Sequence, residues 1–222
     1  MILSSHHHNS YWLSILLVEE AIKKRRSIRR FKDKPVSISQ IKKIIEAGTF
    51  APSGKNSQTW RFTVLTDNEK NKVTTLMDKK LKALTQKHGK PVMGSSINSC
   101  KIMKEAPVLV LVWNTGVNFE SPRLQEMLSK LHLVWPNAEK LGHMALVQGV
   151  SAAIQNMLLM AHSMGLGSLW LADVYYVFDE LTEYFDTSWE LVAGISFGYP
   201  EESEMNKNPP SKLSVDEVTE FR

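Results

Sequence analysis

A long apolar segment constrains the fold more than any other feature of this chain. Residues 143–164 read HMALVQGVSAAIQNMLLMAHSM, and the polar residues among them are few. A helix that is apolar around most of its circumference is buried, so we expect it to be the central helix of the core. No run of 18 consecutive apolar residues occurs anywhere in the sequence. A membrane span is therefore not expected.

Strands are predicted around that helix. Residues 107–113 (PVLVLVW) form a continuous apolar run, which is typical of a central strand buried on both faces. Strands are also expected at 61–66, 167–172 and 191–199. Helices are predicted at 13–24, at 41–48 after Ser37 or Ser39 as a cap and with Gly48 as the C-terminal glycine, and at 69–88. Residues 89–99 are rich in turn-forming types. These elements predict one α+β domain.

Composition excludes several classes of protein. The 222 residues are 43% apolar and 23% charged, with a formal net charge of +4, which indicates a soluble globular protein rather than a disordered one. We expect a flexible N-terminus at 1–12 and a single domain at 13–222. The lone Cys100 rules out an internal disulfide and favours a reducing, cytoplasmic location. His6–His8 are read as a tag or solvated terminus, because flexible ends rarely pre-organise metal ligands, and no metal site is predicted.

Familiar catalytic motifs do not occur. The sequence has no CxxC, HExxH or GxSxG. The GKNS of the loop at 54–57 does not fit a P-loop, since Thr49 and Asn56 stand where glycine and Ser/Thr are needed. Gly165 and Gly167 follow a helix, whereas a dinucleotide fingerprint follows a strand.

The strongest local signal is the basic segment KKRRSIRR at 23–30, with six cations in eight residues. Three interpretations are open on these residues alone: a solvated edge, a nucleic-acid patch, or a phosphate site made of cations and a serine hydroxyl. No aromatic residue interrupts the segment, although single-strand binders use aromatics for stacking. Nucleic-acid binding is therefore the less favoured of the two functional interpretations.

Four blocks in order resemble the nitroreductase family of FMN-dependent oxidoreductases. They are RRSIRRF (25–31), APSGKNSQTW (51–60), SAAIQNMLLMAHSMGLGSLWLAD (151–173) and GISFGYP (194–200). The resemblance covers about residues 13–213. It implies a three-layer α/β/α fold with a central, mostly antiparallel sheet around a long buried helix.

The resemblance also implies where the FMN phosphate binds. Arg25, Arg26 and Ser27 match the positions that hold the phosphate and ribityl chain. Arg29 matches a residue at the N1/C2 edge of the flavin. Lys212, in PPSKL, matches a C-terminal cation that completes the phosphate site.

Further positions match residues that contact the flavin ring. Pro52, Ser53 and Asn56 correspond to the loop that lines the isoalloxazine. Asn98 and Lys101 correspond to an Asn-x-x-Lys pair against the pyrimidine edge. Reduced FMN is anionic at N1, so a cation such as Arg29 or Lys101 at that edge favours the reduced state.

The segment Trp170, Leu171, Ala172 and Asp173 matches the backbone that reaches flavin N5. Two departures from the family pattern stand out. Asp173 occupies a position where glycine is common, and Pro210 stands where some members have a second C-terminal cation. Asp173 adds negative charge near the flavin if its side chain points inward.

The activity implied is hydride transfer from NADH or NADPH through FMN to an electron-poor acceptor, such as a nitroaromatic or quinone, in a ping-pong cycle. The flavin carries the hydride chemistry, so no catalytic side chain is predicted. The resemblance implies a homodimer with FMN at the subunit interface, residues 114–140 as a variable lid and 200–222 as a C-terminal arm. Alternatives are a same-fold enzyme for reductive dehalogenation or flavin breakdown, and a basic nucleic-acid-binding module.

Overall fold

A four-stranded antiparallel sheet forms the centre of the computed structural model, which describes residues 18–116, 126, 129–130, 135, 137–208 and 210–222. The strands are β1 (Trp60–Leu65), β2 (Val108–Asn114), β3 (Gly167–Leu171) and β4 (Glu190–Gly198), in the order β1-β2-β4-β3. The apolar run at 107–113 was predicted to be a central strand, and β2 confirms it: every residue of β2 is buried. A parallel bridge from Ser27 to Ser168 adds the basic segment to the free edge of β3.

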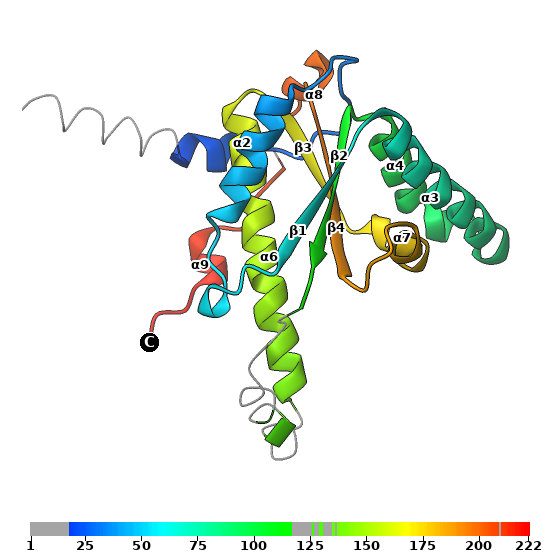
Figure 1. The fold of residues 1–222 in the computed structure, drawn as a ribbon. Helices are drawn as coiled ribbons and strands as arrows, with labels where there is room; N and C mark the ends of the chain where they lie inside the picture. The colour runs from blue at the N-terminus through cyan, green and yellow to red at the C-terminus, as the bar shows by residue number, and fades with distance from the viewer. Residues whose placement is uncertain (1–17, 117–125, 127–128, 131–134, 136, 209) are drawn as a thin grey trace, which may run out of the picture.

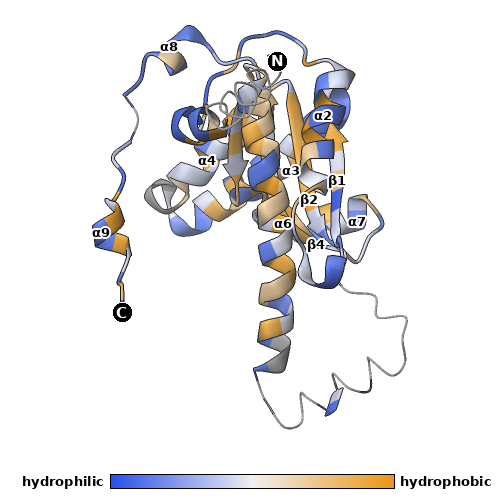
Figure 2. Cartoon of the chain, turned by 90° about the vertical axis from the view of Figure 1, so that its left-hand side faces the viewer, coloured by the Kyte–Doolittle hydropathy of each residue, from blue (hydrophilic) through white to orange (hydrophobic). Residues whose placement is uncertain are grey.

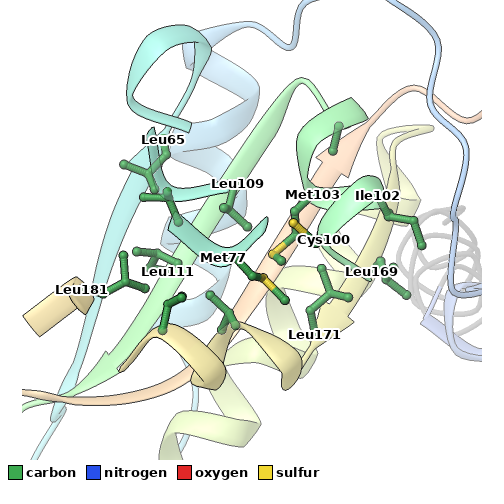
Figure 3. Close-up of a cluster of buried hydrophobic side chains, with 14 of the residues drawn as sticks. Leu65, Met77, Cys100, Ile102, Met103, Leu109, Leu111, Leu169, Leu171 and Leu181 are labelled. Carbon is green, nitrogen blue, oxygen red and sulfur yellow. The ribbon is translucent and has the colours of Figure 1, made fainter. Parts of the chain in front are cut away.

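Helices cover both faces of the sheet, which confirms the predicted α/β/α layers (Figure 1). On one face lie α2 (Ile38–Thr49) and α6 (Ala138–Ser163), and their core includes Val108, Val110 and Val112 of β2. On the other lie α3 (Asp67–His88), α4 (Lys90–Glu105), a 3-10 turn η2 (Asp173–Val177) and α7 (Phe178–Tyr184). Their core, shown in Figure 3, includes Leu109 and Leu111. Successive β2 residues thus feed opposite cores, as strand alternation requires.

Two local predictions were wrong. Residues 90–99, expected to be turn-rich, belong to α4, which begins after Gly89 (φ 84°) with Pro91 in its first turn. Met93, Ser96, Cys100 and Met103 are its buried face, and burial at this helical spacing outweighs the weak helix propensity of glycine and serine. Gly48 does not end α2, which continues to Thr49. A Cβ on Gly48 would lie 3.0 Å from Met157 Cγ on α6, so this glycine allows the two helices to pack closely.

Ser37 is the N-cap of α2. Its hydroxyl accepts a hydrogen bond from the Gln40 N–H, and the Gln40 side chain accepts one from the Ser37 N–H. This capping box confirms one of the two candidate caps and satisfies helix donors that would otherwise lack partners.

The long helix α6 is buried only along part of its length. Val150, Ala153, Ile154 and Met157 are fully buried, whereas the N-terminal turns extend beyond the sheet (Figure 2) and leave Leu141 and Met144 about half exposed. By length and composition alone Lys140–Ser163 could cross a membrane, but its buried half is the core helix of this domain. The prediction of a buried central helix holds for that half.

The remaining boundaries refine the predicted segments. Residues 18–24 are helical, whereas the N-terminus at 1–12 and most of the lid at 114–140 lie outside the described residues. Asn114 ends β2 and Ala138–Lys140 begin α6, and the lid between these elements stays a prediction. Residues 200–222 contain α8 (Glu202–Met205) and α9 (Val215–Val218). Figure 2 shows α9 standing apart from the body of the domain.

Candidate cofactor site

A cavity of about 360 Å³, which we call the cationic cavity, lies between the basic segment and the C-terminal residues. Its lining brings together Lys23, Arg25, Arg26, Ser27, Arg29, Lys207, Asn208, Pro210 and Lys212. Six of these residues are cations and none is acidic. The four residues predicted at the phosphate, Arg25, Arg26, Ser27 and Lys212, therefore line one cavity together with Arg29, although Lys212 is some 180 residues from the others in sequence.

After the helical residues 23–24, the basic segment follows the edge of the sheet. The Ile28 N–H donates to Ser168 O at 3.0 Å, and the Lys32 N–H donates to Tyr199 O at 2.8 Å. The Ile28 and Phe31 side chains are buried. These contacts fix the backbone from which the Arg25, Ser27 and Arg29 side chains project.

The C-terminal wall contains two residues that sequence reasoning missed, Glu204 and Lys207. The Glu204 carboxylate, 2% exposed, accepts a hydrogen bond from the Arg29 N–H at 3.1 Å and another from the Lys207 ammonium. Both lie shortly after GISFGYP, and their spacing of three residues is a usual one for an ion pair on one side of a helical turn. That spacing is the only signal that could have identified them.

Arg26 is engaged with protein rather than free for a ligand. Its guanidinium donates to Lys207 O and to Asn208 O, the latter at 3.3 Å. Phosphate binding by Arg26 stays a prediction. The observed contacts make it a residue that holds the C-terminal wall against the basic segment.

Burial alone would raise the pKa of Glu204, but the hydrogen bonds from Lys207 and from the Arg29 N–H outweigh it, and the pKa lies below the ordinary value of 4.5. A carboxyl with a lowered folded-state pKa stabilises the fold above its unfolded value, and the contribution is lost as the pH falls through the folded value. The link between the two walls therefore persists at neutral pH.

A second cavity, of about 420 Å³, lies between the basic segment, the C-terminal end of α6 and residues 200–207. We call it the apolar cavity after Ile28, Leu166 and Met205, although its lining also includes His162, Glu204 and the cations Lys23, Lys24, Arg25, Arg26 and Lys207. Burial, followed by the charges of Arg25 and Lys24, lowers the pKa of His162 below 6.5. His162 is thus a neutral, partly buried residue at physiological pH.

The residues predicted at the flavin ring fall into two groups. The first joins the end of β3 to α4: the Asp173 carboxylate accepts hydrogen bonds from Ser96 Oγ at 3.2 Å and from Ser99 Oγ. The Asp173 side chain therefore points toward α4, and its carboxylate is held by two serines of that helix. Asn98 and Lys101 are exposed on the same helix, Lys101 within 3.7 Å of Glu105.

Leu169 and Leu171 belong to the core beneath α3 and α4, so strand alternation points Trp170 to the opposite face, where it is 39% exposed. Leu171 is buried and Ala172 is exposed. The structure thus brings Trp170–Asp173 and α4 together next to the basic segment.

The second group, the loop with Pro52, Ser53 and Asn56, lies elsewhere. A Cβ on Gly149 would meet Ser53 Cβ at 3.3 Å, so the loop packs against α6 at that residue. His162, which lines the apolar cavity beside Arg25, is 13 residues further along α6, or about 20 Å. Figure 1 shows the loop after α2 beside the middle of α6, whereas the basic segment lies near the C-terminal end of that helix. One chain does not bring the loop to the cationic cavity.

Comparisons with known proteins agree with this architecture. The model of the nitroreductase family matches residues 22–199. A Methanothermobacter thermautotrophicus protein, provisionally named NADH dehydrogenase/NAD(P)H nitroreductase, is 31% identical over 153 residues, which are 69% of this chain and 59% of that protein. The chain thus spans less than two thirds of that relative.

Two solved structures resemble the whole chain. A BluB-like flavoprotein from Clostridium difficile 630 has a TM-score of 0.72 and 29% identity, covering 92% of this chain and 98% of that one. A provisionally named nitroreductase in complex with FMN, from Desulfovibrio desulfuricans, has a TM-score of 0.63 and 25% identity, covering 92% and 96%.

The fold is α+β, with a cation-lined cavity at the edge of its sheet. The chain belongs to the nitroreductase family.

Proposed function

We propose that this protein binds FMN non-covalently and uses it to transfer hydride from NADH or NADPH to an electron-poor acceptor, such as a nitroaromatic or quinone. The cationic cavity is the observation that carries the proposal. It supplies several fixed cations and the Ser27 hydroxyl without an opposing carboxylate, which is the chemistry that a phosphate monoester requires.

Further support comes from the order of the groups along the sheet edge. The basic segment, which lines the cationic cavity, is bridged to Ser168 of β3, and β3 leads to Trp170–Asp173. Asp173 is hydrogen-bonded to α4, the helix that carries Asn98 and Lys101. A phosphate in the cavity would leave a flavin ring beside these groups.

FMN, when bound, supplies the hydride chemistry at N5, so the protein's part is binding and orientation. Arg25, Ser27 and Lys212 bind the phosphate, and Arg29 and Lys101 place positive charge at the N1/C2 edge. A backbone N–H within 170–173 donates toward N5. The ring face stays open to the dinucleotide and then to the acceptor, which the ping-pong order requires.

We also propose a homodimer in which the partner supplies the Pro52–Asn56 loop. The loop packs on α6 at Gly149, about 20 Å along that helix from His162, which lines the apolar cavity beside Arg25. Exposed apolar surface occurs where a partner is needed: Phe50 is 79% exposed beside an apolar groove formed by α2, α6 and residues 18 and 21. The C-terminal arm exposes Leu213, Val215 and Phe221 by 69–88%, which fits an arm that packs on another chain.

Steady-state kinetics test the reaction. We expect FMN-loaded protein to oxidise NADH or NADPH only slowly without an acceptor, and faster with nitrobenzene or a benzoquinone. Double-reciprocal plots at several acceptor concentrations should be parallel, as a ping-pong order predicts. Intersecting lines would contradict that order. Reduction of the bound FMN by neither dinucleotide would instead favour the same-fold alternatives, dehalogenation or flavin breakdown.

The cytoplasmic location stays a prediction.

Burial raises the pKa of the Cys100 thiol to about 11. This cysteine therefore behaves as a packing residue, and the proposal gives it no redox role.

A further inference from the structure

The cationic cavity lacks a cation at one position of its C-terminal wall. Pro210, which lines it, stands where some members of the family have a second C-terminal cation. A phosphate dianion would then meet only one cation, Lys212, from the predicted C-terminal wall. Lys207, three residues before Pro210, lines the same cavity.

The Lys207 ammonium is anchored in a way that surface lysines are not. It donates to the carboxylate of Glu204, whose side chain is 2% exposed, while the Lys207 side chain itself is 52% exposed. Glu204 is fixed in turn by the Arg29 N–H at 3.1 Å. An ammonium has three donors, so the contact with Glu204 leaves two for a ligand.

The backbone of Lys207 is anchored as well. The Arg26 guanidinium donates to Lys207 O and Asn208 O, and the Glu201 N–H donates to Arg30 O at 3.1 Å. The ammonium is thus held to the basic segment from both its backbone and its side chain. Little conformational entropy would be lost when it meets an anion.

The carboxylate that anchors Lys207 does not face the ligand. Glu204 lines the apolar cavity and is absent from the lining of the cationic cavity, whereas Lys207 lines both. A phosphate in the cationic cavity would therefore contact the ammonium with the carboxylate behind it.

We propose that Lys207, positioned by Glu204, is a ligand of the FMN phosphate and replaces the cation that Pro210 lacks. The inference rests on the proposed function, because it assigns a ligand within that cofactor site. Glu204 is a positioning residue and touches no cofactor atom.

Affinity for FMN and for riboflavin, which lacks the phosphate, tests the assignment. The variants are Lys207→Gln and the double variant Glu204→Gln/Lys207→Gln, which avoids a buried unpaired carboxylate. Lys32→Gln is the matched control, since Lys32 is 48% exposed, pairs with Glu202 at 3.9 Å and does not line the cavity. Fluorescence titration of each protein after removal of flavin gives the dissociation constants.

We expect both Lys207 variants to bind FMN about tenfold more weakly, the loss typical of one charge-assisted contact. Riboflavin affinity should stay within about twofold, and Lys32→Gln should match the wild type with both ligands. Adding Pro210→Arg to Lys207→Gln should restore FMN affinity, because it puts a cation back into the same cavity.

Three results would overturn the proposal: unchanged FMN affinity in the double variant, equal losses for FMN and riboflavin, or no restoration by Pro210→Arg. Failure of the wild-type protein to bind FMN is a separate outcome, which would contradict the proposed function itself.

Discussion

Charge near a ligand matters only where the side chain is fixed and partly desolvated, and Arg25 and Lys32 illustrate the difference. Arg25 is partly buried and lines both cavities, whereas Lys32 is exposed and pairs loosely with Glu202. We expect Arg25→Ala to weaken FMN binding by about 1.5–3 kcal/mol and Lys32→Ala by well under 1. Isothermal titration of both variants checks this. Equal losses would indicate a diffuse basic surface and would favour the nucleic-acid alternative.

We expect Lys101 to act on the redox state of the cofactor more than on its binding. The Lys101 side chain is 70% exposed, and its pairing with Glu105 at 3.7 Å is a surface contact that a ring edge could replace. The reduced cofactor is anionic and gains from that cation, whereas the oxidised cofactor is neutral at the ring.

We therefore expect Lys101→Met to lower the potential of bound FMN by about 30 mV, equivalent to about 1.4 kcal/mol for two electrons. The affinity for oxidised FMN should change by less than about tenfold. A dye-coupled redox titration with parallel binding measurements tests this. An unchanged potential with a collapsed affinity would place Lys101 at the phosphate or in the fold instead.

At the scale of elements, the contact between β3 and the basic segment connects stability to the site. A Cβ on Gly167 would lie 2.7 Å from Ile28 Cγ1 and 2.9 Å from Ile28 Cβ, so the segment must move. We expect Gly167→Ala to cost about 1–3 kcal/mol and to weaken FMN binding, because Ser27 and Arg29 move with Ile28. Thermal unfolding and FMN titration measure both effects.

Gly94→Ala is the control for that prediction. It adds the same methyl group in helix α4, where no atom lies within 4 Å, and should leave stability unchanged or raise it by up to about 1 kcal/mol. If Gly167→Ala were as stable as this control, the basic segment would not be packed as described.

Elements with strong periodicity could be predicted from sequence, and weakly patterned ones could not. The apolar run of β2 and the capping serine of α2 carry their structure locally. Helix α4 does not, because its glycine and serines resemble a turn until Met93 and Met103 are buried against the sheet. The predicted phosphate residues were brought together, whereas Glu204 and Lys207 were missed because their role depends on a fold in which residues 204 and 29 meet.

At the scale of the whole molecule, the separation of the loop from the cationic cavity predicts shared sites. In a mixed dimer, one chain would carry Arg25→Ala and Lys212→Ala, and the other would carry Asn56→Trp on the exposed loop. Each mutant homodimer should bind little FMN. The heterodimer should bind half as much as the wild type, because one site then contains an intact cavity from one chain and an intact loop from the other.

Purification of the heterodimer by two different affinity tags, followed by flavin quantification, tests that arrangement. A heterodimer without FMN would mean that each site is built within one chain, and the proposed position of the loop would be wrong.

The most direct test of the central claim is the stoichiometry and affinity of FMN binding to the wild-type protein. The measurement is a titration of flavin-free protein with FMN, followed by desalting, absorbance and light scattering. We predict one FMN per 25.2 kDa chain, a dissociation constant below the micromolar range, and a particle of two chains. A colourless protein after desalting, with no binding in the titration, would contradict the account.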